Sequence, residues 1–223
     1  MAAATPSSES SGTRPFHHGQ LAEALLAAAI ERAREGGPGA IGLRDVTRAV
    51  GVTPRAAYRH YADRDALVLA VARVALGALR DEIARRLELV PDADETDASR
   101  LLHAARSLRA VGDGYIAAAL AEPGLFETAL FGLDDMVETR SGPDEPATAY
   151  EQLLGAIEAL VRLGRIPEAA AEVTAVTCWS TVHGFATLAT QGPLRELDRD
   201  AAGALGGRVV EAITRSVTGV EDL

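Results

Sequence analysis

The stretch that decides the fold is LRDVTRAVGVTPRAAYRHYADRDAL, residues 43–67. Its first half carries apolar residues at helical spacing, namely Leu43, Val46 and Val50. Gly51 suits the left-handed conformation that ends a helix. Thr53 and Pro54 then supply an N-cap and a first helical residue whose φ is already set, and this second helix can run only to about Tyr61. The sequence therefore predicts two short helices joined by a tight turn, the geometry of a helix-turn-helix.

The second of these helices has one outward arc, at 100° per residue, formed by Arg55, Ala56, Tyr58 and Arg59. Ala57 and Tyr61 point back toward the preceding helices. An Arg side chain can donate two hydrogen bonds to guanine O6 and N7, and a small Ala lets a helix approach base edges closely. The helix N-terminus and the Thr53 hydroxyl can both bind phosphate. This arc is therefore the side that we expect to enter the major groove of DNA.

Charge is distributed unevenly along the chain, whose formal net charge is −10. Residues 14–64 carry eight Arg and five acids, net +3, whereas residues 65–223 carry 14 Arg and 26 acids, net −12. A basic N-terminal segment followed by an acidic remainder indicates a polyanion-binding module joined to a part that avoids polyanions. The alternative is ordinary variation in surface charge along the chain. All 22 basic residues are Arg, a compositional bias, so their position is informative and their number is not.

The rest of the chain has helical periodicity nearly throughout. An apolar stripe precedes the break at residues 36–38 and consists of Ala22, Leu26, Ala29, Ile30 and Ala33. Asp63 is the predicted cap of a long helix that ends near Pro91. Further helices are expected near residues 98–121, 124–137, 146–164, 167–190 and 198–218. A hydrophobic share of 48% over 223 residues is enough for a buried core, and the predicted fold is all-α with about nine helices.

The cysteine count, the motifs and the lengths of the apolar runs disfavour several classes of protein. Cys178 is the single cysteine, so neither an internal disulfide nor a four-cysteine zinc site can form. No HExxH motif or glycine-rich phosphate loop is present, and the apolar runs are far shorter than the roughly 20 residues that span a bilayer. Residues 1–13 do not have the pattern of a secretory signal. We therefore expect a cytoplasmic protein that is not an enzyme and has no metal, cofactor or membrane partner.

The segment GVTPRAAYRHYADRDAL, preceded by LRDVTRAV and by a helix that ends in Gly, resembles the DNA-binding domain of TetR-type repressors over roughly residues 18–70. The resemblance implies that Tyr58 and Arg64 contact phosphates and that His60 lies at the DNA-facing margin. It also implies that Arg55, Ala56 and Arg59 face bases. The predicted DNA-binding residues are Arg44, Thr53, Arg55, Ala56, Tyr58, Arg59, His60 and Arg64.

Three positions depart from the family pattern: Tyr61 stands where Phe is usual, Arg64 where Lys is usual, and Thr47 where a buried Ala is common. The first two changes keep the chemistry. A buried Thr47 hydroxyl needs a backbone carbonyl as its partner.

The remainder resembles, more loosely, the ligand-binding and dimerisation domain of the same family. Residues 123–131, PGLFETALF, and 179–188, WSTVHGFATL, look like a subtype named for a Trp-His-Gly pattern. Trp179 and His183 lie one helical turn apart and can offer an aromatic platform and a polar contact to a ligand. The alternative is that Trp179 fills the core and His183 bonds a neighbouring helix. The predicted pocket residues are Tyr115, Phe126, Phe131, Met136, Trp179 and His183.

The last helix carries small residues that would let two backbones approach closely. The predicted dimer-interface residues are Gly203, Gly206, Gly207, Val210 and Val217. In the family, the last two helices of each subunit form a four-helix interface, and the alternative for these glycines is compositional drift. A recognition helix of two turns buries too little surface for tight operator binding alone, which independently favours a twofold dimer on a palindrome.

The resemblance implies a ligand-responsive repressor that binds a palindromic operator in double-stranded DNA as a homodimer and is released by a small-molecule effector. The alternative is a helical small-molecule carrier or interaction module without operator binding. The predicted organisation is an arm over residues 1–15, a helix-turn-helix domain over 16–64, a connecting helix over 65–90, and a ligand-binding and dimerisation domain over 91–223.

Overall fold

The computed structural model describes residues 18–130 and 146–222, and over these residues the chain is helical without a strand. The α-helices are α1 (His18–Gly36), α2 (Leu43–Val50), α3 (Pro54–Ala57), α4 (Arg64–Leu87), α5 (Asp97–Ala121), α6 (Pro123–Ala129), α8 (Ala149–Arg162), α9 (Ala171–Thr190) and α10 (Arg199–Thr218). Short 3₁₀ helices cover Pro38–Ala40 and Glu168–Ala170. The all-α prediction with about nine helices is confirmed for the described part of the chain. The predicted arm, Phe131, Met136 and the second half of the helix expected at 124–137 lie outside it.

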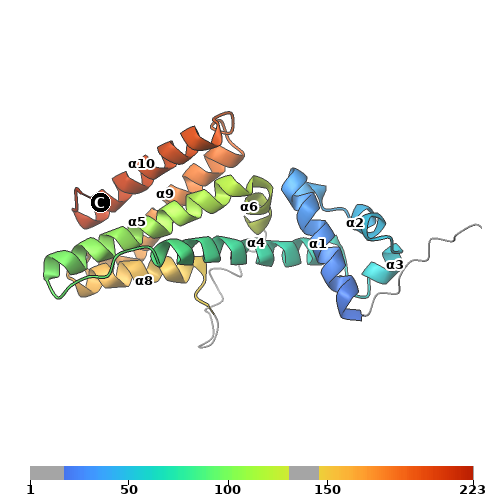
Figure 1. Ribbon diagram of the computed structural model, residues 1–223, viewed down its shortest axis with the longest axis horizontal. Coiled ribbons are helices and arrows are strands. Elements are labelled where there is room, and N and C mark those ends of the chain that lie inside the picture. The colour runs from blue at the N-terminus through green and yellow to red at the C-terminus, as the bar shows by residue number, and fades with distance from the viewer. Residues whose placement is uncertain (1–17, 131–145, 223) are drawn as a thin grey trace, which may run out of the picture.

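Figure 1 shows α1, α2 and α3 at one end of an elongated molecule, with α4 running from them into a helical bundle. The N-terminal core joins apolar residues of α1 to α4 with two residues of α6, Leu125 and Ala129. In α1 the fully buried residues are Leu25, Ala29 and Ala33. The predicted stripe is therefore correct at Ala29 and Ala33, and Leu26 and Ile30 also pack against this core, but the stripe omitted Leu25.

The larger core lies around α5, which packs against α4, α8, α9 and α10. Helix α4 contributes to both cores: Val68 and Val71 belong to the N-terminal core, whereas Leu79 and Ile83 belong to the larger one. Because one uninterrupted helix is shared, a change of packing at either end of α4 can be transmitted to the other end.

Helices α4 and α8 begin at N-cap residues that the sequence supplies. The carboxylate of Asp63 accepts a hydrogen bond from the backbone N–H of Ala66 at 2.7 Å, which confirms the predicted cap of α4. Thr148 and Glu151 form a reciprocal capping box at the start of α8. Among the described helices, none has both the length and the hydropathy that a bilayer span requires.

Candidate nucleic-acid interface and ligand pocket

The turn between α2 and α3 is built on Gly51, whose φ of 76° is left-handed. The N–H of Gly51 donates to the carbonyl of Arg48 at 3.2 Å, and the N–H of Val52 donates to that of Thr47 at 2.9 Å. This pair of bonds is the Schellman pattern that ends a helix. The Thr47 hydroxyl, in a residue 1% exposed, donates to the carbonyl of Arg44 at 3.0 Å. The backbone partner that the sequence required for Thr47 is therefore present.

Replacing Gly51 with Ala is expected to lower the free energy of unfolding by about 1–2 kcal/mol, because a residue with a Cβ is strained in the left-handed region. No neighbouring atom lies within 4 Å of the position that the Cβ would take, so the effect is one of backbone conformation alone. Urea unfolding at fixed protein concentration measures it. Gly39→Ala is the matched control, since Gly39 also has open space around it but no positive φ. Equal effects of the two substitutions would contradict this account of the turn.

Helix α3 presents one face to solvent and buries the other. It is α-helical over Pro54–Ala57 and continues as a turn to His60, so the α-helix is shorter than the one expected from the sequence. Ala57 is fully buried, and the Tyr61 hydroxyl donates to the carbonyl of Ala22 in α1 at 3.3 Å. Tyr58 is 56% exposed. Ala57 and Tyr61 therefore face inward and Tyr58 outward, as the periodicity predicts.

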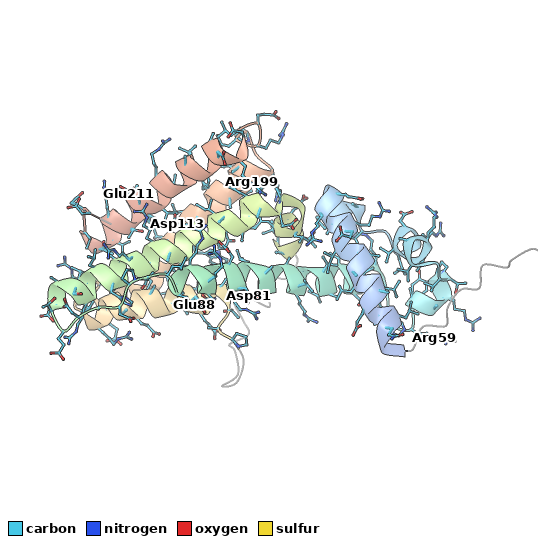
Figure 2. The ribbon with its side chains drawn as sticks, in the orientation of Figure 1. Arg59, Asp81, Glu88, Asp113, Arg199 and Glu211 are labelled. Carbon is cyan, nitrogen blue, oxygen red and sulfur yellow. The ribbon has the colours of Figure 1, made fainter. Side chains whose placement is uncertain are left out.

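The exposed surface around α3 carries cations without acidic partners. Arg44, Arg55 and Arg59 are exposed and form no ion pair with any residue that the structure describes. By contrast, Arg48 on α2 pairs with Asp45 at 3.0 Å. Figure 2 shows Arg59 at the end of the molecule farthest from the C-terminal bundle. These guanidinium groups are free to donate hydrogen bonds to bases or phosphates.

Of the remaining predicted DNA contacts, Thr53 is exposed at the N-cap of α3 and makes no side-chain capping bond there, while His60 is half-buried. Ala56 is also half-buried, on the same turn. Of the predicted DNA contacts, Arg44, Thr53, Arg55, Tyr58 and Arg59 are therefore exposed within the unit formed by α1, α2 and α3, the three-helix unit. Their contacts with DNA stay predictions.

Arg64 has an intramolecular role that the sequence did not indicate. Its Nε donates to the carbonyl of Ile41 at 2.9 Å and its Nη2 donates to the carbonyl of Pro38. Nη1 pairs with Asp65 at 3.2 Å. Arg64 thus ties the start of α4 to the loop before α2. Its side chain is 42% exposed, so the predicted phosphate contact would have to use the remaining N–H groups.

In the bundle, four of the predicted pocket residues form one aromatic cluster. The Tyr115 hydroxyl lies 2.7 Å from Nδ1 of His183. The ring of Phe126, from α6, is centred 5.8 Å from that of Tyr115 and 5.9 Å from that of His183. Trp179 stacks at a tilt 5.3 Å from Tyr150 of α8, a residue that the sequence analysis missed. Its position in an apolar helical stripe with Leu153 was the available signal.

A cavity of about 30 Å³ lies beside this cluster, between α5, α8, α9 and α10. Tyr115, Tyr150 and Trp179 line it, whereas Phe126 lines a wider opening of about 340 Å³ between α4, α5 and α6. Burial raises the pKa of Tyr115 to about 12, and the nearby indole N–H of Trp179, which favours the phenolate, partly opposes this rise. Burial also lowers the pKa of His183, so its neutral form is favoured, and Nδ1 of this form can accept a hydrogen bond from the Tyr115 hydroxyl. The four predicted residues are in contact with one another, but Tyr115 and Trp179 line one opening, Phe126 lines the other, and His183 lines neither.

Helix α6 connects this cluster to the three-helix unit. A Cβ on Gly124 would overlap the carbonyl oxygen of Ala33, so α6 and the end of α1 touch through their backbones. Beside this contact, Nε of Arg34 pairs with Glu122 at 3.1 Å. Phe126, two residues after Gly124, contacts the aromatic cluster. The short helix therefore contacts the aromatic cluster through Phe126 and α1 through Gly124.

The glycines of α10 face in different directions. Gly203 and Gly207 have no atom of their own subunit near the position of a Cβ. A Cβ on Gly206, however, would lie 2.9 Å from both Ile116 and Phe185. Val210 is 1% exposed, in the core. The prediction that Gly206 and Val210 contact a second subunit is therefore corrected, because both pack inside their own.

Helix α9, which packs against α10, carries exposed apolar residues. Val173 is 63% exposed, and Val176 and Leu188 are each 44% exposed. Val217, also predicted at the interface, is half-buried against the subunit's own core. Exposed valine and leucine on one helix, with open glycines on the next, are typical of a surface that packs against another helix pair.

Two family models match the chain. One described as bacterial regulatory proteins, tetR family, matches residues 25–71, and one described as tetracyclin repressor-like, C-terminal domain, matches residues 108–213. The second description does not specify the Trp-His-Gly subtype, which stays a prediction. No curated protein matches the chain in sequence at a significant level.

Solved structures share the fold over nearly their whole length. A protein of unknown function from Rhodococcus sp. RHA1 has a TM-score of 0.65 and 24% identity, over 92% of this chain and 99% of that one. A TetR-family transcriptional regulator from Pectobacterium atrosepticum has a TM-score of 0.57 and 23% identity, over 90% and 95%. A TetR variant from Acinetobacter baumannii AYE, in complex with minocycline, has a TM-score of 0.56 and 17% identity, over 94% and 100%.

Proposed function

This chain belongs to the TetR family of bacterial transcriptional regulators, and from that premise we propose that it binds a palindromic operator as a homodimer and leaves it when a small molecule enters the bundle. The observation that carries the proposal is the outward face of α3, where Arg55, Tyr58 and Arg59 are exposed beside a well-formed turn. Membership of the family favours this function over that of a helical carrier without operator binding.

The C-terminal bundle is the proposed effector domain. A TetR with the same fold binds minocycline, which supports a small molecule as the class of effector. A ligand shifts an equilibrium only if it binds one state more tightly than the other. Displacement of Phe126 would move α6, and the contact of Gly124 with Ala33 would pass that movement to α1. A coupling of about 1–3 kcal/mol would change operator affinity about 5- to 150-fold.

Helix α4 provides a second connection between the two cores, since it contributes to both. We propose that α4 and α6 together set the separation of the two recognition helices in the dimer. A ligand that favours a separation unequal to the spacing of successive major grooves would release the operator.

Salt dependence of operator binding tests the proposal. Fluorescence anisotropy of a labelled operator should give a binding constant whose logarithm falls linearly with the logarithm of the salt concentration, with a slope of about −0.9 for each phosphate neutralised. The acidic bundle is expected to add nothing to this slope. Binding that is independent of salt, or no binding at all, would contradict the proposal.

A further inference from the structure

The cavity between α5, α8, α9 and α10 holds two buried polar atoms that make no hydrogen bond with residues 18–130 or 146–222. They are Nε1 of Trp179 and Oγ1 of Thr214, and both residues line the cavity. None of the described residues that line it carries an acidic or basic side chain. The site is therefore an apolar chamber in which two hydrogen-bonding groups make no well-aligned bond to the described residues. The Trp179 indole lies near the Tyr115 hydroxyl, but that hydroxyl is bonded to His183.

Thr214 differs from other buried threonines of the bundle. The hydroxyls of Thr128 and Thr218 each donate to the carbonyl four residues earlier, at 2.7 and 2.8 Å. Thr214 is 0% exposed, yet its hydroxyl makes no bond with any residue in the described part of the chain. Burial of a polar group without a partner costs free energy, so a bound molecule that supplies a partner gains affinity.

Burial favours the neutral forms of two side chains that line the chamber, Tyr115 and Cys178, and of His183 beside it. Burial raises the pKa of Tyr115 to about 12 and that of the Cys178 thiol to about 11. The Tyr115 hydroxyl is already bonded to His183, whose pKa burial lowers. A charged ligand would lose its hydration here without gaining a counter-ion.

We propose that the effector is an uncharged, largely apolar molecule with a hydrogen-bond acceptor that receives the indole N–H of Trp179, and with a second polar atom within reach of the Thr214 hydroxyl. This inference rests on the proposed function, because it specifies the ligand class of the same domain. An aromatic or cyclic skeleton suits the chamber, since the rings of Tyr150 and Trp179, 5.3 Å apart, form one wall.

The size of the chamber explains why such a ligand would act on the equilibrium. About 30 Å³ holds one or two water molecules. A larger molecule must select a state in which the four surrounding helices are farther apart, and it therefore binds the two states unequally. Two of those helices, α9 and α10, also present the proposed dimer surface.

Trp179 is the single tryptophan of the chain, so one indole cross-peak in a ¹⁵N–¹H correlation spectrum of the full-length protein reports on the chamber. Four probes share a phenyl skeleton of nearly equal size: acetophenone, ethylbenzene, benzoate and benzylammonium. Acetophenone is expected to move the indole peak downfield and to bind about five- to tenfold more tightly than ethylbenzene. Ethylbenzene is expected to perturb the peak without the downfield shift, and the two ions should leave it unchanged.

The variant Trp179→Phe keeps an aromatic ring and removes the donor. Calorimetry of this variant should show that the preference for acetophenone over ethylbenzene disappears, with ethylbenzene as the internal control for lost packing. An indole peak that no probe moves, a preference for either ion, or an acetophenone preference that survives in the variant would overturn the inference. Operator binding is measured separately, so a regulator that binds its operator but shows no carbonyl preference would refute only the ligand class.

Discussion

The variant Gly207→Glu is expected to become monomeric and to lose about 100-fold or more of its operator affinity, because avidity from two linked half-sites contributes a factor of about 10² to 10⁴. Gly207 has open space around it within its own subunit, and Glu is a better helix former than Gly. The folded subunit should therefore tolerate the change. In the proposed four-helix interface, however, the new carboxylate would be buried without a partner.

Gly155→Glu is the matched control for this prediction. Gly155 also lies in a helix, α8, with no atom near the position of its Cβ, and it is exposed. Sedimentation equilibrium should show a dimer for the control and a monomer for Gly207→Glu at the same concentration. A dimeric Gly207→Glu variant that binds the operator normally would place the interface elsewhere.

The variant Arg59→Ala is expected to lower operator affinity by about 1–3 kcal/mol in each half-site and to relax base preference at one position of each half-site. Arg59 is exposed and has no acidic partner among residues 18–130 and 146–222, so its removal leaves no unpaired group in the protein. Anisotropy titrations with operators substituted at single positions would measure both effects.

Arg162→Ala is the control for charge alone. Arg162 lies in α8 and its side chain is 69% exposed. Among the described residues its ion pair is a distant one, with Glu158 at 4.0 Å. The Arg162→Ala variant loses the same formal charge as Arg59→Ala but from a different surface. Its operator affinity should stay within about twofold of that of the parent protein. If the two Ala variants lose equal affinity, or if Arg59→Ala keeps full base preference, α3 is not the element that reads bases.

The helix-turn-helix could be predicted closely because its signals are local. Gly51 permits the left-handed conformation that ends α2, and Pro54 restricts φ to a helical value where α3 begins. Inward and outward residues of α3 followed from periodicity alone. The intramolecular bonds of Arg64 could not be predicted, because they depend on the path of the loop through Pro38 and Ile41.

The C-terminal bundle was predicted less completely, for a reason seen in α10. The sequence of α10 does not distinguish its glycines. Because α5 and α9 pack against one side of α10, Gly206 faces inward, whereas Gly203 and Gly207 face outward. The meeting of Tyr115 with His183 likewise depends on tertiary packing of α5 against α9. For the contact between α6 and α1, the single sequence signal was a glycine directly after Pro123.

The most direct test of the central claim is selection of duplexes from a random pool by the full-length protein, followed by sequencing. The account predicts one enriched palindrome whose half-sites are separated by about one helical turn or a multiple of it, with enrichment lost in Arg59→Ala. A pool that shows no enriched sequence, or one enriched without twofold symmetry, would contradict it.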